Sequence, residues 1–406
     1  MHLIAELRRH PRPLWALFFA TLVNRLGLMV LPFLALYLTQ ELRYSTAQAG
    51  VVVGVYGVGG LRINLAGSSL GDRLGIIRVT IAALVGAGVL LTVVPHVTGY
   101  VPLLGVIVLW SFCSESVRTL SFAAVGQYSD PALLKSAFAL QRLAINLGAS
   151  IGPLVGGFLA RNHFTWLFYI DAATSFGAAF LLYRFLPRDA SVAPAPEVPM
   201  GTVLTAALRA LSDRRLVAIN LVLLPIILCY SQLDSSFPLY VVGELGHSER
   251  FYGFLYAINA VVVTLVEVPL TIAMTNTPLR RTAILGGVCF SGGLGLVALG
   301  VPVSLALGIL VLTVGEMVFL PPSAAYISAI APPGQRSAYT GVQFAVWSFS
   351  SIVGPIGGTW ILARYGGVTL WSSLVVVALM TAVLARVCLS RSAGGAVTPA
   401  RPPALF

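Results

Sequence analysis

Twelve long apolar runs, separated by short segments rich in Gly, Pro and charged residues, divide the sequence. Most reach the length of about 20 residues that a helix needs to cross the hydrocarbon core of a bilayer. A spanning segment must satisfy its own backbone hydrogen bonds, and the polar–apolar alternation of barrel strands is absent. The runs therefore predict an all-α integral membrane protein with twelve transmembrane helices. They cover residues 13–39, 46–70, 79–95, 101–128, 135–161, 165–186, 215–241, 249–274, 281–299, 303–330, 335–364 and 368–390.

The composition excludes several other classes of protein. Only 10% of the 406 residues are charged and 57% are hydrophobic, whereas a soluble globular domain has about 25% charged residues. The formal net charge is +11, but the basic residues are dispersed between apolar runs instead of being gathered on one solvated face. Such a distribution does not suit a nucleic-acid binder, so no nucleic-acid partner is expected.

The basic residues also predict the orientation in the membrane. If both termini are cytoplasmic, the cytoplasmic segments carry 17 of the 25 Lys and Arg residues and the outer loops carry four. Cytoplasmic loops are normally the more basic ones, so we expect both termini inside the cell. The preference for Arg over Lys, with Lys135 as the one lysine, and the richness in Ala, Val, Leu and Gly suggest a GC-rich bacterial genome. A bacterial inner membrane is the expected location, and the lipid bilayer the expected surroundings.

The second half of the sequence repeats the first. Gly50 recurs as Gly253, 203 residues later, and Glu115 recurs as Glu316 at an offset of 201. Six runs per half place both repeats in the same direction across the membrane, an architecture typical of transporters with a cavity between two bundles. We expect two pseudo-symmetric six-helix bundles. The predicted boundaries are 1–186 for the first bundle, 187–214 for a cytoplasmic linker with an amphipathic helix, 215–390 for the second bundle and 391–406 for a disordered cytoplasmic tail.

Three segments of the sequence contain recognisable motifs. The loop after the second run contains Asp72, Arg73, Gly75 and Arg78, and a Gly-rich segment of the fifth run contains Gly148, Gly152, Pro153, Gly156 and Gly157. The first run contains Asn24-Arg25-Leu-Gly27 and Pro32. The loop resembles the signature loop of the major facilitator superfamily, and the Gly-rich segment resembles the antiporter motif of that family. The first run is similar to its drug:proton antiporter-like branch with twelve spans.

The resemblance implies roles for both motifs. In the family, the loop aspartate, here Asp72, docks on the N-terminus of the eleventh helix when the transporter is open to the outside, as a helix dipole favours. Ser68, Ile76 and Ile77 depart from the family pattern, which has Gly and basic residues there. The glycines of the antiporter motif allow helices to approach closely, and Pro153 bends its helix, which would seal the cavity. The alternatives are a simple tight turn for the loop and simple helix packing for the glycines.

Ionisable side chains inside the apolar runs indicate the coupling chemistry, because each costs about 2.5–3.5 kcal/mol at the centre of a span. Glu115 lies near the middle of its run, and Arg118 is one turn away on the same face. Burial favours the neutral acid and the arginine favours the ionised one, a competition expected of a proton-carrying group. The alternative is a permanent structural ion pair. Glu316, at the repeated position, and Asp234 are the further candidates for proton coupling.

The intramembrane charges differ in sign between the halves. The first half has four arginines in its runs, whereas the second half has Asp234, Glu267 and Glu316. Some of these groups are expected to pair across the central cleft; alternatively, Arg142 and Glu267 reach water at the membrane surface. Asp171, near the outer end of the sixth run, is expected to have a structural or capping role.

Amides, aromatic rings and arginines on the helices that form the cavity in the family are candidate substrate contacts. Such mixed linings suit amphiphilic organic molecules, although each of these residues also suits simple packing between helices. The candidates are Asn24, Arg25, Tyr56, Gln141, Arg142, Asn146, Tyr230, Gln232, Asn259, Gln343 and Trp347.

The sequence contains no phosphate-binding Gly-x4-Gly-Lys-Ser/Thr loop, no His-Glu-x-x-His and no Gly-x-Ser-x-Gly motif. No enzyme activity, metal or cofactor is therefore expected. The sequence predicts a secondary active transporter that works by alternating access as a monomer and exports small amphiphilic organic compounds or drugs in exchange for protons. The alternatives are a proton symporter that imports a sugar, peptide or organic acid, and a non-transporting membrane receptor or scaffold.

Overall fold

The computed structural model describes residues 10–66, 74–130, 133–161, 163–186, 205–206, 208–332 and 335–389. Throughout these residues the regular elements are helices, and no strand occurs among them. Nine helical segments of this part of the chain are long and apolar enough to cross a membrane. The all-α membrane fold expected from the sequence is thereby confirmed. The number of twelve spans stays a prediction, because α4 (Thr46–Ala66) and α11 (Arg214–Tyr230) are not among the nine and α16 (Arg336–Cys388) counts once.

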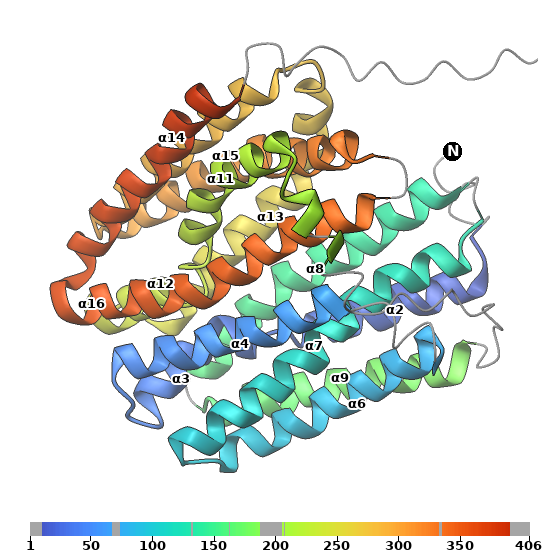
Figure 1. Ribbon diagram of the computed structural model, residues 1–406. Helices are drawn as coiled ribbons and strands as arrows, with labels where there is room; N and C mark the ends of the chain where they lie inside the picture. Colours follow the sequence, from blue (N-terminus) through green and yellow to red (C-terminus); the bar gives the residue numbers. More distant parts are fainter. Residues whose placement is uncertain are drawn as a thin grey trace, which may run out of the picture.

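The helices of the first half pack against one another and occupy the lower part of Figure 1. Helix α6 continues into the short 3-10 turn η1 (Val94–His96). The elements are α2 (Arg12–Leu26), α3 (Val30–Gln40), α4 (Thr46–Ala66), α6 (Ile76–Val93), α7 (Tyr100–Tyr128), α8 (Leu134–Ala160) and α9 (Thr165–Phe185).

The helices of the second half form the other group, in the upper part of Figure 1. They are α11 (Arg214–Tyr230), α12 (Ser236–Pro238), the π-helical η3 (Leu239–Glu244), α13 (Glu249–Ala273), α14 (Leu279–Ala298), α15 (Pro302–Ile330) and α16 (Arg336–Cys388).

Helix α16 consists of two arms that meet at Gly366. The backbone of Gly366 has φ 79° and ψ 171°, a combination that is essentially restricted to glycine. Both carboxylate oxygens of Glu244, at the end of η3, accept the backbone N–H of Gly367, at 2.8 and 3.0 Å. The first arm therefore ends at a bend, and the second arm turns back from it, as the orange and red parts of Figure 1 show.

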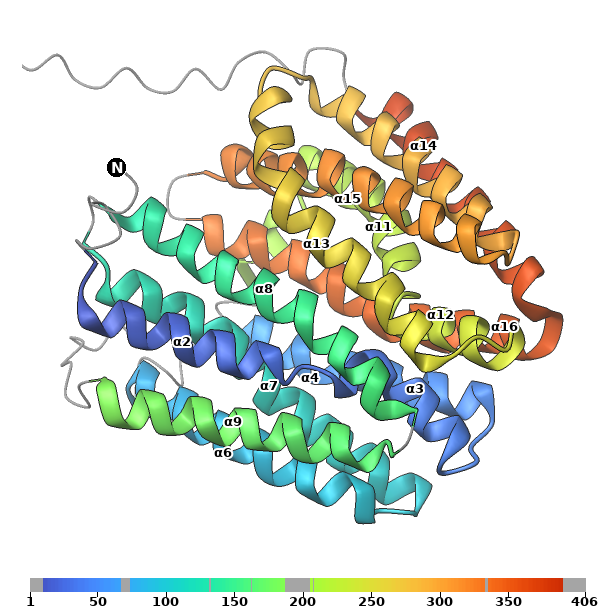
Figure 2. The ribbon, with the colours of Figure 1, turned by 180° about the vertical axis from the view of Figure 1, so that it is seen from behind.

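Successive long helices run in alternating directions, so the bundle has two ends (Figures 1 and 2). We call the end at which α2 begins and α16 ends the terminal end, and the end at which α3 leads into α4 the opposite end. The two groups meet along two helix pairs, α4 with the first arm of α16 and α8 with α13. The second pair is seen most clearly in Figure 2.

Two apolar runs that the sequence presents as continuous are interrupted in the structure. The first run breaks at residues 27–29, between α2 and α3, and the seventh breaks at residues 231–235, between α11 and α12. A Cβ atom at Gly152 would lie 3.2 Å from the carbonyl oxygen of Leu26, and one at Gly354 would lie 1.9 Å from Oγ of Ser231. Each Gly-Pro repeat thus packs closely beside the break in the first helix of its own half.

Several predicted features lie outside the described residues. They include Asp72 and Arg73 of the signature loop, residues 187–204 of the linker and the tail from residue 390 onward. Of the loop motif, the structure describes Gly75, with φ 90° directly before α6, and Arg78 in the first turn of that helix. The docking of the loop, the amphipathic helix and the domain boundaries therefore stay predictions.

Candidate functional site

A cavity of about 610 Å³ lies between the two helix groups. Residues of α3, α4 and α7 line it on one side, and residues of α11, α15 and α16 line it on the other, together with residues of the break after α11. It extends from Pro355 to Thr340, which lies close to the start of α16 and hence to the terminal end. The predicted site residues that line this central cavity are Tyr56, Glu115, Arg118, Tyr230, Asp234, Gln343 and Trp347.

Glu115 and Arg118 form an ion pair on the wall made by α7. The Nε and Nη2 atoms of Arg118 donate to Oε2 of Glu115 at 2.9 and 2.5 Å. The guanidinium carbon of Arg118 also lies 5.9 Å from the ring centroid of Phe344, which belongs to α16 in the other helix group. Arg118 therefore connects the acid of one group to an aromatic ring of the other, across the cavity.

Asp234 lies on the facing wall, in the break between α11 and α12. Asp234 and Tyr256, in α13, also line one small cavity within the second helix group. The Oδ1 atom of Asp234 is shielded from solvent and has no hydrogen-bond partner within the described part of the chain. No Lys, Arg or His nitrogen of the described residues comes within ion-pairing distance of it.

Aromatic rings form much of the remaining wall. Tyr230 and Trp347 meet edge to face, with ring centroids 5.7 Å apart and planes at 79°. On the other side of the cavity, Tyr56 packs against Trp110 in the same manner, at 4.9 Å and 66°. These rings offer apolar faces to a molecule in the cavity, and Gln343 adds an amide to the same wall.

A side cavity of about 80 Å³ lies inside the first helix group, behind the Glu115–Arg118 pair. Asn24 and Arg25 line it without lining the central cavity. The Nδ2 atom of Asn24 donates to Oγ of Ser175 at 3.3 Å. Asp171 is 3% exposed and also lines this cavity, and its Oδ2 atom has no hydrogen-bond partner among the described residues. Its expected structural or capping role stays a prediction.

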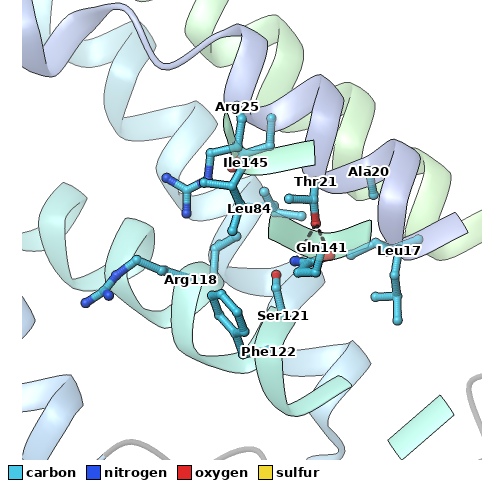
Figure 3. Close-up of a pocket in the computed structure, with 13 residues that line it drawn as sticks. Leu17, Ala20, Thr21, Arg25, Leu84, Arg118, Ser121, Phe122, Gln141 and Ile145 are labelled. Carbon is cyan, nitrogen blue, oxygen red and sulfur yellow. Dashed lines mark hydrogen bonds between the residues drawn. The ribbon is translucent and has the colours of Figure 1, made fainter. Parts of the chain in front are cut away.

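A smaller cavity of about 10 Å³ lies beside it in the same group (Figure 3). Here the Nε2 atom of Gln141 donates to Oγ1 of Thr21 at 3.0 Å. Figure 3 shows this bond between α8 and α2, with the guanidinium group of Arg118 pointing away from it. Gln141 is 2% exposed, so the structure places it between two helices of one group and not on the central cavity.

The repeated acids Glu115 and Glu316 have different surroundings. Asn259, in α13, donates through Nδ2 to Oε2 of Glu316 at 3.0 Å and to Oγ1 of Thr313 at 2.9 Å. Glu316 and Asn259 are not among the residues that line the central cavity. Sequence reasoning named both residues but missed Thr313, which follows Asn259 by 54 residues.

Gln232 and Asn146 are two more predicted cavity residues that are not among those lining the central cavity. Gln232 donates through Nε2 to the carbonyl oxygen of Gly354 at 3.0 Å and accepts the hydroxyl of Ser236 at 2.7 Å, and thereby holds the break after α11. Asn146 lies in the middle of α8 and is not among the residues that line the central cavity.

Arg142 and Glu267 form an ion pair between the two helix groups. Nη2 of Arg142, in α8, donates to Oε1 of Glu267, in α13. The side chain of Glu267 is 11% exposed and that of Arg142 is 57% exposed. Both residues lie in the terminal half of their helices. Of the two possibilities left open by the sequence, the structure shows pairing across the groups.

The opposite end of the bundle is closed by backbone contacts between the groups. A Cβ atom at Gly50 would lie 2.7 Å from the carbonyl oxygen of Pro355, and one at Gly253 would lie 2.6 Å from that of Pro153. A Cβ atom at Gly157 of the antiporter motif would likewise lie 2.7 Å from the carbonyl oxygen of Glu249. The repeat that relates Gly50 to Gly253 in sequence thus relates two equivalent contacts in space, and both bring the two helix groups together at this end.

Comparisons with known proteins agree with this architecture. The sequence model of the protein family described as Major Facilitator Superfamily matches residues 17–271 and 233–404 of this chain. The uncharacterized MFS-type transporter YhjO of Bacillus subtilis is 26% identical over 388 residues, which are 93% of this chain and 92% of that protein. A Na(+), Li(+), K(+)/H(+) antiporter of Planococcus maritimus is 22% identical over 81% of this chain and 84% of its own length.

Solved transporter structures share the fold. The nucleoside transporter NupG superimposes with a TM-score of 0.77 at 15% identity, covering 93% of this chain and 98% of its own. A peptide transporter, POT, in complex with sulfate superimposes with a TM-score of 0.76 at 15% identity, over 93% of this chain and 94% of its own.

Proposed function

Because the chain belongs to the major facilitator superfamily, and is therefore a membrane transporter and not an enzyme, we propose that it exports small amphiphilic organic compounds or drugs in exchange for protons. It works as a monomer in a bacterial inner membrane, and its twelve spans surround the central cavity. Transport proceeds by alternating access, in which this cavity opens to the two sides of the membrane in turn. Both termini face the cytoplasm, so the terminal end is the cytoplasmic end.

The observation that carries this proposal is a cavity that reaches toward the terminal end at Thr340 and holds an acid–arginine pair in its wall. At the opposite end the two helix groups approach closely at Gly50 and Gly253, and we propose that this contact is the seal. In the proposed orientation the cavity therefore receives a substrate from the cytoplasm. A transporter must break the seal and close the terminal end to release that substrate outside.

Glu115 and Arg118 provide the proposed coupling to protons. When Glu115 takes up a proton from the outside, it loses its charge, and Arg118 loses the partner that holds it at 2.5 Å. Arg118 already touches Phe344 of the other helix group, so its release changes a contact between the groups. Glu316 and Asp234 are the further acids that are able to carry protons in the second half.

The signature loop and the antiporter motif complete the proposal. Asp72, Arg73, Gly75 and Arg78 act as the latch at the terminal end, and the glycines of α8 act as the seal. The Planococcus maritimus relative, whose name describes a cation/H(+) antiporter, supports exchange over symport. A driving force of about 150 mV supplies about 3.5 kcal/mol per proton, which sustains an approximately 300-fold gradient of a neutral substrate.

Transport by purified protein in vesicles with an imposed pH gradient tests the direction. We expect a fluorescent amphiphile to move against its gradient while protons flow the other way, and the movement to stop when the pH gradient is dissipated. Accumulation in the same direction as the protons would instead establish a symporter. Absence of any gradient-dependent flux across a panel of amphiphiles would favour a non-transporting receptor.

A further inference from the structure

Four charged side chains of the first helix group surround the side cavity of about 80 Å³. They are Arg25 in α2, Glu115 and Arg118 in α7, and Asp171 in α9. Figure 3 shows the guanidinium groups of Arg25 and Arg118 pointing in the same direction. The four formal charges cancel, but only Glu115 and Arg118 form a pair. Within the described part of the chain, no carboxylate lies at ion-pairing distance from Arg25, and Oδ2 of Asp171 is buried without a hydrogen-bond partner.

The size and the polar lining of the side cavity suit a small cluster of water molecules. Burial of a charge is costly unless polar groups or water compensate it. A polar cavity needs about 10–15 Å³ to hold one water molecule, which then makes about two to four hydrogen bonds. The side cavity is several times larger than this minimum, and Asn24, Ser114 and Ser175 add polar groups to its lining. Water in this cavity would connect Arg25 with Asp171.

The side cavity and the central cavity meet at the ion pair of α7. Four residues line both of them, whereas α9 contributes no residue to the lining of the central cavity. A proton passed on from Asp171 would therefore reach Glu115 from behind, without entering the space that is offered to a substrate. The shared lining residues are Leu31, Tyr56, Glu115 and Arg118.

The two acids lie at different depths in the bundle. Asp171 is in the second turn of α9, which begins at the opposite end, whereas Glu115 is near the middle of α7. Asp171 is 3% exposed and hence shielded from solvent in this state, while Glu115 lines the cavity that reaches toward the terminal end at Thr340. An exchanger needs such an arrangement, because a path open to both sides at once would leak protons.

The charged and titratable groups around the side cavity come from α2, α4, α7 and α9. Helices α3 and α6 contribute only apolar residues to its lining, and α8 contributes none. His96, in η1, lies with Nε2 3.2 Å from the hydroxyl of Tyr169, which is two residues before Asp171 and thus on the other side of α9. The groups that line the cavity are Arg25, Tyr56, Glu115, Arg118 and Asp171.

We propose that protons from outside reach Glu115 through the side cavity, with Asp171 as the first acid that binds them and water as the link. An incoming proton binds the carboxylate of Asp171, passes along the water molecules to the carboxylate of Glu115, and leaves through the central cavity into the cytoplasm. Asp171 is then ionised again and balances the charge of Arg25. This inference rests on the proposed exchange of substrate for protons, and it assigns a part in coupling to a helix that does not line the central cavity.

Transport in vesicles with an imposed pH gradient tests the role of Asp171 in the full-length protein. Asp171→Asn should lower pH-driven flux at least tenfold and leave downhill exchange largely intact, whereas Asp171→Glu should keep most of the pH-driven flux. Asp171→Asn combined with Glu115→Gln should lose no more than either single variant, because the effects of residues that act as a unit are not additive. Glu41→Gln is the control, since it removes one negative charge at an exposed position at the opposite end, and it should have no effect.

Arg25→Gln combined with Asp171→Asn separates a proton-carrying role from a structural one. This double variant keeps the side cavity neutral, and thermal unfolding shows whether it is folded. Its pH-driven flux should stay lost, because no acid replaces Asp171. Recovery of that flux would overturn the inference and leave Asp171 with charge balance alone. Undiminished pH-driven flux in folded Asp171→Asn would overturn it as well.

Infrared difference spectra between acidic and alkaline buffer test proton binding directly, in vesicles without substrate or gradient. The C=O stretching band of a protonated carboxyl group should be present in the wild type, shifted in Asp171→Glu and missing from Asp171→Asn. Because Asp171→Glu keeps the charge, its spectrum decides even if the neutral variants do not fold. A carboxyl band that is the same in the wild type and in Asp171→Glu would overturn the inference.

The inference and the proposed function fail separately. If a pH gradient drives export in the wild type while no band depends on Asp171, proton-coupled export stands and the route through the side cavity is wrong. If the band depends on Asp171 but no pH gradient drives the movement of any amphiphile, the proton site stands and proton-coupled export is wrong.

Discussion

At the scale of single residues, identical side chains at repeated positions have acquired different surroundings. Glu115 is paired with Arg118 and lines the central cavity, whereas Glu316 is held by Asn259 inside the second helix group. An acid coupled to transport needs access to protons and a partner that moves when its charge changes. Glu115 meets both requirements in this structure.

Glu115→Gln should therefore abolish proton-driven transport while leaving downhill exchange of substrate. The amide keeps the shape and some hydrogen bonding to Arg118, but it cannot take up and release a proton. We expect at least a tenfold loss of pH-driven flux in vesicles.

Glu316→Gln is the comparison for that variant, and its loss should be smaller, because Glu316 does not line the central cavity. Unchanged pH-driven flux in Glu115→Gln would remove Glu115 from the coupling mechanism.

Predictions at the scale of secondary-structure elements concern the bend and the seal. Gly366 joins the two arms of α16 in a backbone conformation that side chains strongly disfavour. Gly366→Ala should lower the free energy of unfolding by about 1–3 kcal/mol, measured by thermal or denaturant unfolding in detergent.

Gly105→Ala is its control, because Gly105 lies in α7 with open space around the position of a Cβ atom. That substitution should be neutral or slightly stabilising, since alanine favours a helix. Equal stability losses in the two variants would show that the bend at Gly366 has no special requirement for glycine.

The contact between α13 and α8 predicts how the opposite end opens. Gly253→Ala places a methyl group 2.6 Å from the carbonyl oxygen of Pro153, so the two helices must separate. We expect the equilibrium to shift toward the state that is open at this end. A cysteine introduced at Ser351, on the cavity wall of a variant without native cysteines, should react several-fold faster with an impermeant thiol reagent added from outside.

Gly243→Ala serves as control at the same end, since nothing lies within 4 Å of its added Cβ atom. It should leave the labelling rate of the Ser351→Cys reporter unchanged. If Gly253→Ala also left that rate unchanged, the backbone contact would not be part of the seal.

At the scale of the whole molecule, the two helix groups are joined near the terminal end by the pair Arg142–Glu267. Closure and opening of the terminal end must move α8 relative to α13. The pair is therefore expected to bias the balance between the state that is open at this end and the state that is closed there. Groups in direct contact typically show interaction energies of about 0.5–3 kcal/mol in double-mutant cycles.

Arg142→Glu should reduce transport at least tenfold, because it places two carboxylates together at this contact. The exchange of both charges, Arg142→Glu with Glu267→Arg, should recover most of the activity. Arg364→Gln, at the opposite end, should have little effect. Transport by the double variant no better than by Arg142→Glu alone would show that the contact is not used in the cycle.

The apolar runs, the internal repeat, the basic loops and the intramembrane charges were all readable from the sequence alone. Insertion of a helix into a bilayer depends on the hydrophobicity of a contiguous segment, so one stretch of sequence is enough to predict it. The same reasoning found Glu115 with Arg118, which are neighbours on one helix and therefore meet whatever the rest of the chain does.

Only the tertiary structure decided which of the remaining polar groups meet. Arg142 pairs with Glu267 at a separation of 125 residues, Gln141 bonds to Thr21, and Asp234 has no cationic partner in the described part of the chain. The breaks at residues 27–29 and 231–235 were likewise invisible in hydrophobicity, because glycines on other helices create the space for them. Such contacts depend on the rotation and approach of helices that are distant in the chain, and no local pattern of residues specifies those quantities.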